Sequence, residues 1–243
     1  MILRRFIVHI EEQNWFAVGL DVIVVIVGIF LGMQVTEWNE ERKNQYEEKR
    51  LLTDLHTDLT NAIARVDSLL ERMSEYNRTI DLAARKIFST EFKGSLSDDE
   101  CRDIARGHIA PHLKVKGIST LEEVLATGKL PLISDRELRK EVLKMHSQLE
   151  LDSDQIDFVV NDLKNLPDNH ANLFPRMLTE HDDVAVQCDI DRIRSDQTVM
   201  NKIVSNRGRH LGIEGRFTQQ RKALLELKTL IENTLKAEHL NKG

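Results

Sequence analysis

The sequence contains few of the residues that interrupt helices. Among its 243 residues there are four prolines and eleven glycines, and aromatic residues make up only 5%. Scarce proline and glycine beside abundant Leu, Glu, Lys and Arg is the composition of long helices. The composition therefore predicts an all-α fold and argues against a sheet-rich domain.

Motifs that carry chemistry are also missing. The chain has no HExxH, CxxC, GxSxG or P-loop pattern, and neither cysteine lies next to a histidine. His170, Glu180, His181, Asp182 and Asp183 could in principle gather around a metal, but their spacing matches no known ligand set and suits solvated loop residues better. We therefore expect a protein that is not an enzyme, with no catalytic residue, no metal and no cofactor.

The chain has no excess of positive charge. Its formal net charge is −6, whereas a nucleic-acid-binding protein needs a basic stripe or patch. The mild acidity therefore argues against a nucleic-acid partner.

Only two cysteines are present, Cys101 and Cys188. They could form a disulfide in an oxidising compartment. In a chain of this length, two buried thiols are the more frequent arrangement. The sequence leaves both arrangements open.

One long apolar run stands out, from Trp15 to Trp38. At 1.5 Å per residue it spans roughly 34 Å, which matches a hydrocarbon core of about 30 Å. Its Phe, Val, Leu and Ile residues contribute on the order of −4 to −8 kcal/mol to insertion, against at most about +3 kcal/mol for Asp21. We expect a transmembrane helix over residues 15–38, the lipid bilayer as a partner, and Trp15 and Trp38 as anchors at the two membrane interfaces.

Two other interpretations fit this run less well. A cleaved signal peptide would have a shorter apolar region followed by small residues, whereas this run continues into Gln34-Val35-Thr36-Glu37-Trp38. A pilin-type leader would place Glu five residues after a processing glycine, and the residue at that distance from Gly19 is Val24.

Four residues of the span are candidates for function. Asp21 is an acid inside an apolar helix; it could relay a proton or ion, or it could lie near the interface and reach the headgroups. Gly28 and Gly32 form a GxxxG pattern that allows close helix packing, and Gln34 could add a hydrogen bond between helices. These residues predict a homo-oligomer or association with another membrane protein.

The rest of the chain is predicted to be helical. Residues 1–14 form a short amphipathic pattern, residues 39–93 a long juxtamembrane helix, and residues 94–243 a helical bundle packed with that helix. The long helix contains a heptad seam, typical of a coiled coil, in which apolar residues follow steps of three and four. The seam consists of Leu52, Leu55, Leu59, Ala62, Val66, Leu69, Met73, Tyr76, Ile80, Ala83 and Ile87.

Helix-start signals divide the bundle further. Ser97-Asp98-Asp99-Glu100 and Ser134-Asp135-Arg136-Glu137 are capping boxes, and the second opens a long helix whose seam has Asp152 as its only polar residue. Two last helices are expected over about 192–206 and 216–240. The predicted break between them contains Gly208, Gly212 and Gly215.

The N-terminal run is similar to a known family. Gly19-Leu20-Asp21, the apolar core that follows, and Glu37-Trp38-Asn39-Glu40 resemble an uncharacterised bacterial family of single-pass membrane proteins, most clearly over residues 19–60. The resemblance implies a bacterial inner-membrane protein with its helical domain outside the cytoplasm, and it implies no activity or site residues. Counting Lys and Arg near the span instead slightly favours a cytoplasmic domain, so the side of the membrane stays open.

Taken together, these features predict a membrane-anchored helical scaffold or interaction protein that self-associates and has no catalytic activity. One alternative is a subunit of an ion- or signal-coupled membrane assembly that uses Asp21. Another is a sensor in which the helical bundle binds a small ligand and passes the signal to a second protein.

Overall fold

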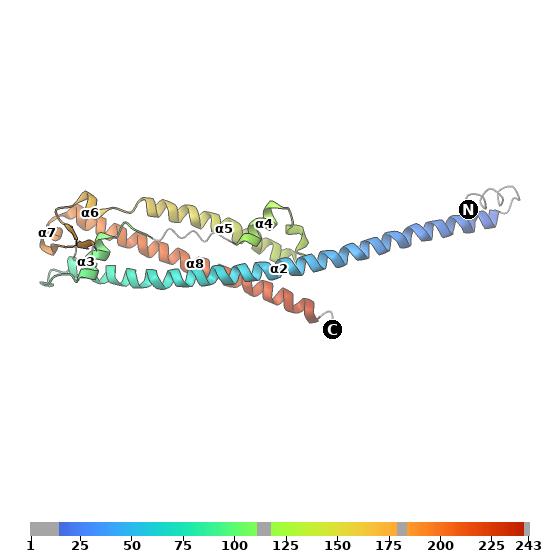
Figure 1. Cartoon of the computed structure of the whole chain (residues 1–243), viewed down its shortest axis with the longest axis horizontal. Helices are drawn as coiled ribbons and strands as arrows, with labels where there is room; N and C mark the ends of the chain where they lie inside the picture. The colour runs from blue at the N-terminus through green and yellow to red at the C-terminus, as the bar shows by residue number, and fades with distance from the viewer. Residues whose placement is uncertain (1–14, 111–117, 179–183, 241–243) are drawn as a thin grey trace. The chain divides into compact units, whose positions relative to one another are not determined.

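The computed structural model describes residues 15–110, 118–178 and 184–240, so the predicted amphipathic segment 1–14 lies outside the described residues. The chain divides into two compact units, residues 1–51 and residues 52–243. The predicted all-α class is confirmed, because helices account for nearly all the regular structure of the described residues (Figure 1).

Helix α2 (Trp15–Phe88) contains the predicted span without interruption. Over residues 22–46 its side chains are exposed, and an 18-residue window has a mean hydropathy of 2.1 with none of it buried. A helix that is apolar all round and uncovered by protein is unfavourable in water. This helix is long enough and apolar enough to cross a membrane.

In the second unit, α2 buries the predicted heptad seam. All its positions from Leu52 to Ile87 are buried, apart from Tyr76, which is half-buried. The Tyr76 hydroxyl donates a hydrogen bond to the backbone oxygen of Asp103 at 3.1 Å. The seam is therefore the face through which α2 contributes to the core of this unit.

Helix α2 ends at Phe88, a few residues before the end at residue 93 that the sequence predicted. The last carbonyls of a helix have no partner within the helix, and a cation near them is favourable. Arg194, from a distant part of the chain, supplies both the hydrogen bonds and the charge. Its guanidinium donates at 2.6–2.9 Å to the carbonyl oxygens of Lys86, Ile87, Ser89 and Phe92.

Local capping signals place the next helices. Ser97 and Glu100 form the predicted capping box at the start of α3. The cap of α5 is Asp135, whose carboxylate accepts from the N–H groups of Glu137 and Leu138, so the predicted cap at Ser134 was one residue early. The helices are α3 (Asp98–Ala105), α4 (Ser119–Ala126), η1 (Leu130–Leu132), α5 (Arg136–Asn161), α6 (Leu166–Asn169) and α7 (Ile190–Ser195).

The last helix corrects the prediction of two helices with a break. Helix α8 (Gln197–Leu240) runs without interruption for 44 residues, through all three glycines. Its buried residues follow alternating steps of four and three. The three glycines are not part of this series and are exposed. The buried residues are Val199, Ile203, Asn206, His210, Ile213, Phe217, Gln220, Leu224, Leu227 and Ile231.

Helices α2 and α8 pack antiparallel within the second unit. His56 pairs with Glu232 at 2.9 Å, and Asp81 accepts hydrogen bonds from Arg207. Residue numbers therefore rise along one helix while they fall along the other. With α5 also packed on α8, the three long helices form the bundle (Figure 1).

A disulfide and a small hairpin complete the second unit. Cys101 on α3 is bonded to Cys188, with a Cα–Cα distance of 5.7 Å, so of the two arrangements that the sequence left open the structure has the disulfide. Strands β1 (Arg176–Leu178) and β2 (Val184–Val186) pair antiparallel. The sequence did not predict these strands.

Candidate functional site

The candidate site is a groove between α5 and α8. The two helices are antiparallel, with Asp162 bound to Arg209 and Gln155 accepting a hydrogen bond from Arg216. The groove has two adjoining parts, which share Gln219 as a lining residue. We call them the glycine part and the polar part.

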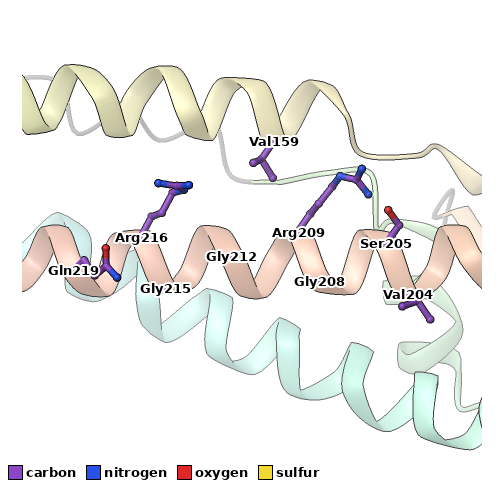
Figure 2. Close-up of a pocket in the computed structure, with 9 residues that line it drawn as sticks. All are labelled: Val159, Val204, Ser205, Gly208, Arg209, Gly212, Gly215, Arg216 and Gln219. Carbon is purple, nitrogen blue, oxygen red and sulfur yellow. The ribbon is translucent and has the colours of Figure 1, made fainter.

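The glycine part has a volume of about 690 Å³. Figure 2 shows the backbone of α8 along one side, with Arg209 and Arg216 extending towards α5. A methyl group built on Gly208, Gly212 or Gly215 would meet no described atom within 4 Å, so contacts with the described residues do not require these glycines. The lining residues are Val159, Val204, Ser205, Gly208, Arg209, Gly212, Gly215, Arg216 and Gln219.

The charged groups of the glycine part already have partners. Lys164 and Arg209 both bind Asp162, and these bonds hold the pKa of its carboxyl below the usual value. The guanidinium of Arg216 donates to the side-chain oxygen of Gln155. Because these cations serve to join α8 to α5, the glycine part has no clear chemistry of its own.

The polar part is smaller, at about 240 Å³, and differs in chemistry. Three of its lining residues are acids and one is a lysine, while Met145 and Leu227 are buried and apolar. The lining residues are Glu141, Lys144, Met145, Gln148, Asp152, Gln219, Gln220, Ala223, Glu226 and Leu227.

Asp152 is the buried acid of the polar part. Only 5% of the residue is exposed, and Gln148 donates a hydrogen bond of 2.9 Å to its Oδ1 atom. A buried carboxylate is costly unless it is paired and hydrogen-bonded. Asp152 is the polar residue that the sequence shows on the seam of this helix, and the structure places it in this groove.

Gln220, on α8, lines the same polar part of the groove as Asp152. It is 4% exposed, and its Oε1 atom has no hydrogen-bond partner among the described residues. A buried acceptor without a partner costs about 1–3 kcal/mol. Sequence reasoning missed Gln220 because the predicted break hid the α8 seam; following its steps of four and three would have found it.

The predicted residues of the span lie on an exposed helix. Asp21, Gly28 and Gly32 are separated by seven and four residues, so they share one face. Added methyl groups on Gly28 and Gly32 would meet nothing within 4 Å. Trp15 is the first residue of α2, and Trp38 has the Arg42 guanidinium 5.0 Å from its ring centroid, a cation–π distance.

Gln34 lies on a different face from the two glycines. At about 100° per residue it projects about 120° away from Gly28 and about 160° away from Gly32. It is exposed on the helix surface. A helix–helix interface centred on the two glycines would therefore not include Gln34.

Of the five residues considered for a metal, only His170 lies among the described residues. His170 Nε2 lies 2.8 Å from Lys202 Nζ, while residues 180–183 fall outside the described residues. Within residues 15–110, 118–178 and 184–240, no three His, Cys, Asp or Glu side chains are grouped to hold a metal ion.

His210 is a buried polar residue that sequence reasoning did not single out. Its Nε2–H donates to the Gly107 carbonyl oxygen at 2.9 Å, and its ring packs edge-on against Tyr76 with centroids 5.0 Å apart. Burial lowers the pKa of His210, which favours the neutral imidazole. We assign it a packing role between α8 and α2.

These observations define the class of the protein. It is an all-α protein with a helix apolar enough to span a membrane and a helical bundle in its second unit.

Comparison with known proteins adds a family similarity. Residues 21–93 match DUF6090, a family of unknown function, which supports the predicted resemblance of the N-terminal part to an uncharacterised family. No curated protein and no solved structure matches the chain.

Proposed function

We propose that this chain is a membrane-anchored helical scaffold or interaction protein that self-associates through its span. It would lie in the bacterial inner membrane as a single-pass protein and have no catalytic activity. The observation that carries the proposal is the exposed, strongly apolar stretch of α2 with an unfilled GxxxG face.

The packing argument rests on Gly28 and Gly32. In lipid, the hydrophobic effect does not drive helices together, so association depends on close backbone contact at small residues. Nothing among the described residues fills the space beside these two glycines. A second span, from another copy of the chain, would fill it and gain the packing energy.

The mass of the full-length protein in nanodiscs tests this proposal. We expect a defined oligomer for the wild type and a smaller mass for the double variant Gly28→Leu, Gly32→Leu, measured by light scattering. Gly19→Leu is the matched control, because Gly19 projects about 180° away from Gly28. A wild-type monomer, or an unchanged oligomer in the double variant, would contradict self-association through this face.

The disulfide supports a location of the bundle outside the cytoplasm. Disulfides persist in oxidising compartments and are rare in the bacterial cytosol. The bond between Cys101 and Cys188 agrees with the orientation that the family resemblance implies. Fusions at the C-terminus test this: we expect activity from alkaline phosphatase and no fluorescence from a green fluorescent protein, and the reverse pattern would place the bundle in the cytoplasm.

A second candidate is a subunit of an ion-coupled membrane assembly. It is favoured by the position of Asp21 on the same face as Gly28 and Gly32, where a neighbouring span would meet it. One helix cannot enclose a path, so the assembly would need several spans. Proton flux into proteoliposomes should then be lost in Asp21→Asn while the oligomer mass is retained; wild-type vesicles without flux would reject this candidate.

A further inference from the structure

We propose that the polar part of the α5–α8 groove binds a small organic cation that carries N–H donors, such as a primary alkylammonium. This inference is independent of self-association through the span, because every residue of the groove lies in the second unit. It gives the bundle a role beyond that of a scaffold.

The charges of the lining favour a cation. Lys144 Nζ lies 3.0 Å from Glu141 Oε2, so this lysine is already paired with one of the three acids. Glu226 lies 3.9 Å from Lys222 Nζ, a lysine outside the lining, and Asp152 has no ion pair among the described residues. A ligand with positive charge is attracted to such a lining, while an anion is repelled.

The hydrogen-bonding groups require a donor. The hydrogen bond from Gln148 uses only one of the two oxygens of Asp152. The Oε1 atom of Gln220 has none among the described residues and has less than 1 Å² of accessible surface, so a ligand reaches it when the Gln220 amide turns into the groove. An ammonium has three donors and no acceptor, so it can bond to both residues at once, whereas a carboxylate or phosphate ligand offers only acceptors.

Size and apolar surface define the ligand further. A volume of about 240 Å³ corresponds to about eight water molecules at about 30 Å³ each, which suits a short alkyl chain and not a nucleotide. Met145, Ala223 and Leu227 supply apolar surface for methylene groups. The chemistry therefore fits a short alkyl chain with at least one ammonium group.

The position of the site gives binding a structural consequence. Asp152 and Gln220 are buried positions on α5 and α8, respectively. A ligand that bonds to both would join the two helices and satisfy the buried acceptor. Because it binds the folded chain, it also stabilises the fold by mass action.

Calorimetric titration of the full-length protein in nanodiscs tests the proposal, with butane-1,4-diamine as the probe. We expect saturable binding of the diamine. Tetramethylammonium, a cation without N–H donors, should bind at least tenfold more weakly, and acetate should not bind. Absence of saturable diamine binding, or equal affinity for tetramethylammonium, would overturn the proposal.

Two nearly isosteric substitutions locate the site. Asp152→Asn removes the charge and Gln220→Met removes the amide oxygen, and each should weaken diamine binding at least tenfold. Asp154→Asn is the matched control on the exposed side of α5 and should bind like wild type. Wild-type affinity in both Asp152→Asn and Gln220→Met would contradict binding in this groove; if one variant fails to fold, the other and the donor dependence of the wild type still decide.

Discussion

At the scale of single residues, Arg194 shows how one side chain can end a helix. Its guanidinium donates hydrogen bonds to carbonyl oxygens at the end of α2 and in the residues that follow it. About a fifth of the Arg194 side chain is exposed, so most of these hydrogen bonds are shielded from water. The end of α2 is therefore determined by a residue more than 100 positions away in the sequence.

Replacing Arg194 with Ala should lower the free energy of unfolding by about 2–4 kcal/mol, because buried carbonyl groups lose their donor. Arg194→Lys should recover only part of the loss, since an ammonium cannot reproduce the planar guanidinium. Chemical denaturation of the full-length protein measures both. The exposed Arg192→Ala is the control; equal stability of Arg194→Ala and the control would contradict the capping role.

Glu100 makes the stability of the fold depend on pH. Burial acts to raise the pKa of its carboxyl, but this effect is outweighed by the Lys86 ammonium at 2.6 Å and the Ser97 N–H at 2.8 Å. The folded-state pKa is therefore below the reference value of 4.5. Such a group stabilises the fold above its unfolded-state pKa, and this contribution is lost as pH falls through the folded-state pKa.

We expect the free energy of unfolding to fall as the pH is lowered from 7 to 3, and to fall less in Glu100→Gln. Denaturant titrations at pH 7, 5, 4 and 3 provide the comparison. Glu91→Gln, at an exposed position, should retain the wild-type pH dependence. The same pH profile for Glu100→Gln and wild type would show that this carboxyl does not contribute.

At the scale of helices, α8 is the element that the sequence predicted least well. Each glycine inside a helix costs about 1 kcal/mol relative to alanine, which made a break at Gly208, Gly212 and Gly215 a reasonable prediction. The helix continues because the series of buried residues on α8 extends past all three glycines, with Ile213 and Phe217 fully buried. Burial of a large apolar side chain contributes about 1.5–3 kcal/mol, more than a glycine costs.

Replacing these three glycines with alanine should therefore stabilise the protein, by about 0.5–1 kcal/mol at each position, because nothing opposes the added methyl group. Thermal or chemical unfolding of the triple variant measures the gain. Gly107→Ala is a useful contrast, since its methyl group would lie 3.1 Å from the Ile104 carbonyl oxygen and should destabilise. A loss of stability in the triple variant would indicate that the glycines pack against a partner.

Other helices followed from local signals. The capping box at Ser97 and Glu100 places the start of α3, and the seam from Leu52 to Ile87 identifies the buried face of α2. Both depend on residues within a few turns of one another. For the candidate groove, only Asp152 could be recognised in advance; Gln220 became visible once the two helices were known to pack together.

At the scale of the whole molecule, the disulfide joins parts that are far apart in the sequence. Cys101 and Cys188 are separated by 87 residues, and Cys101 lies in the same apolar cluster as Ile80, Phe174 and Ile193. Cross-linking a long segment restricts the unfolded chain more than cross-linking a short one. The bond therefore ties α3 to Cys188 in the folded chain and restricts the conformations of the unfolded chain.

The double variant Cys101→Ser, Cys188→Ser should lose about 2–5 kcal/mol of unfolding free energy. Reduction of the wild-type protein with a thiol reagent should give a similar loss, and it should have no effect on the variant. Denaturant titrations with and without the reductant measure this. Equal stability of the oxidised and reduced wild type would show that the disulfide does not stabilise the fold.

Periodicity and composition were enough to establish the helical class, the apolar span and the α2 seam, because each depends on residues close together along one helix. The other features depend on segments that only folding brings together. They are the capping of the end of α2 by Arg194, the continuity of α8, the cysteine pairing, and the position of Asp152 and Gln220 in one groove. These features depend on contacts across the sequence, where burial and hydrogen bonding outweigh local propensity.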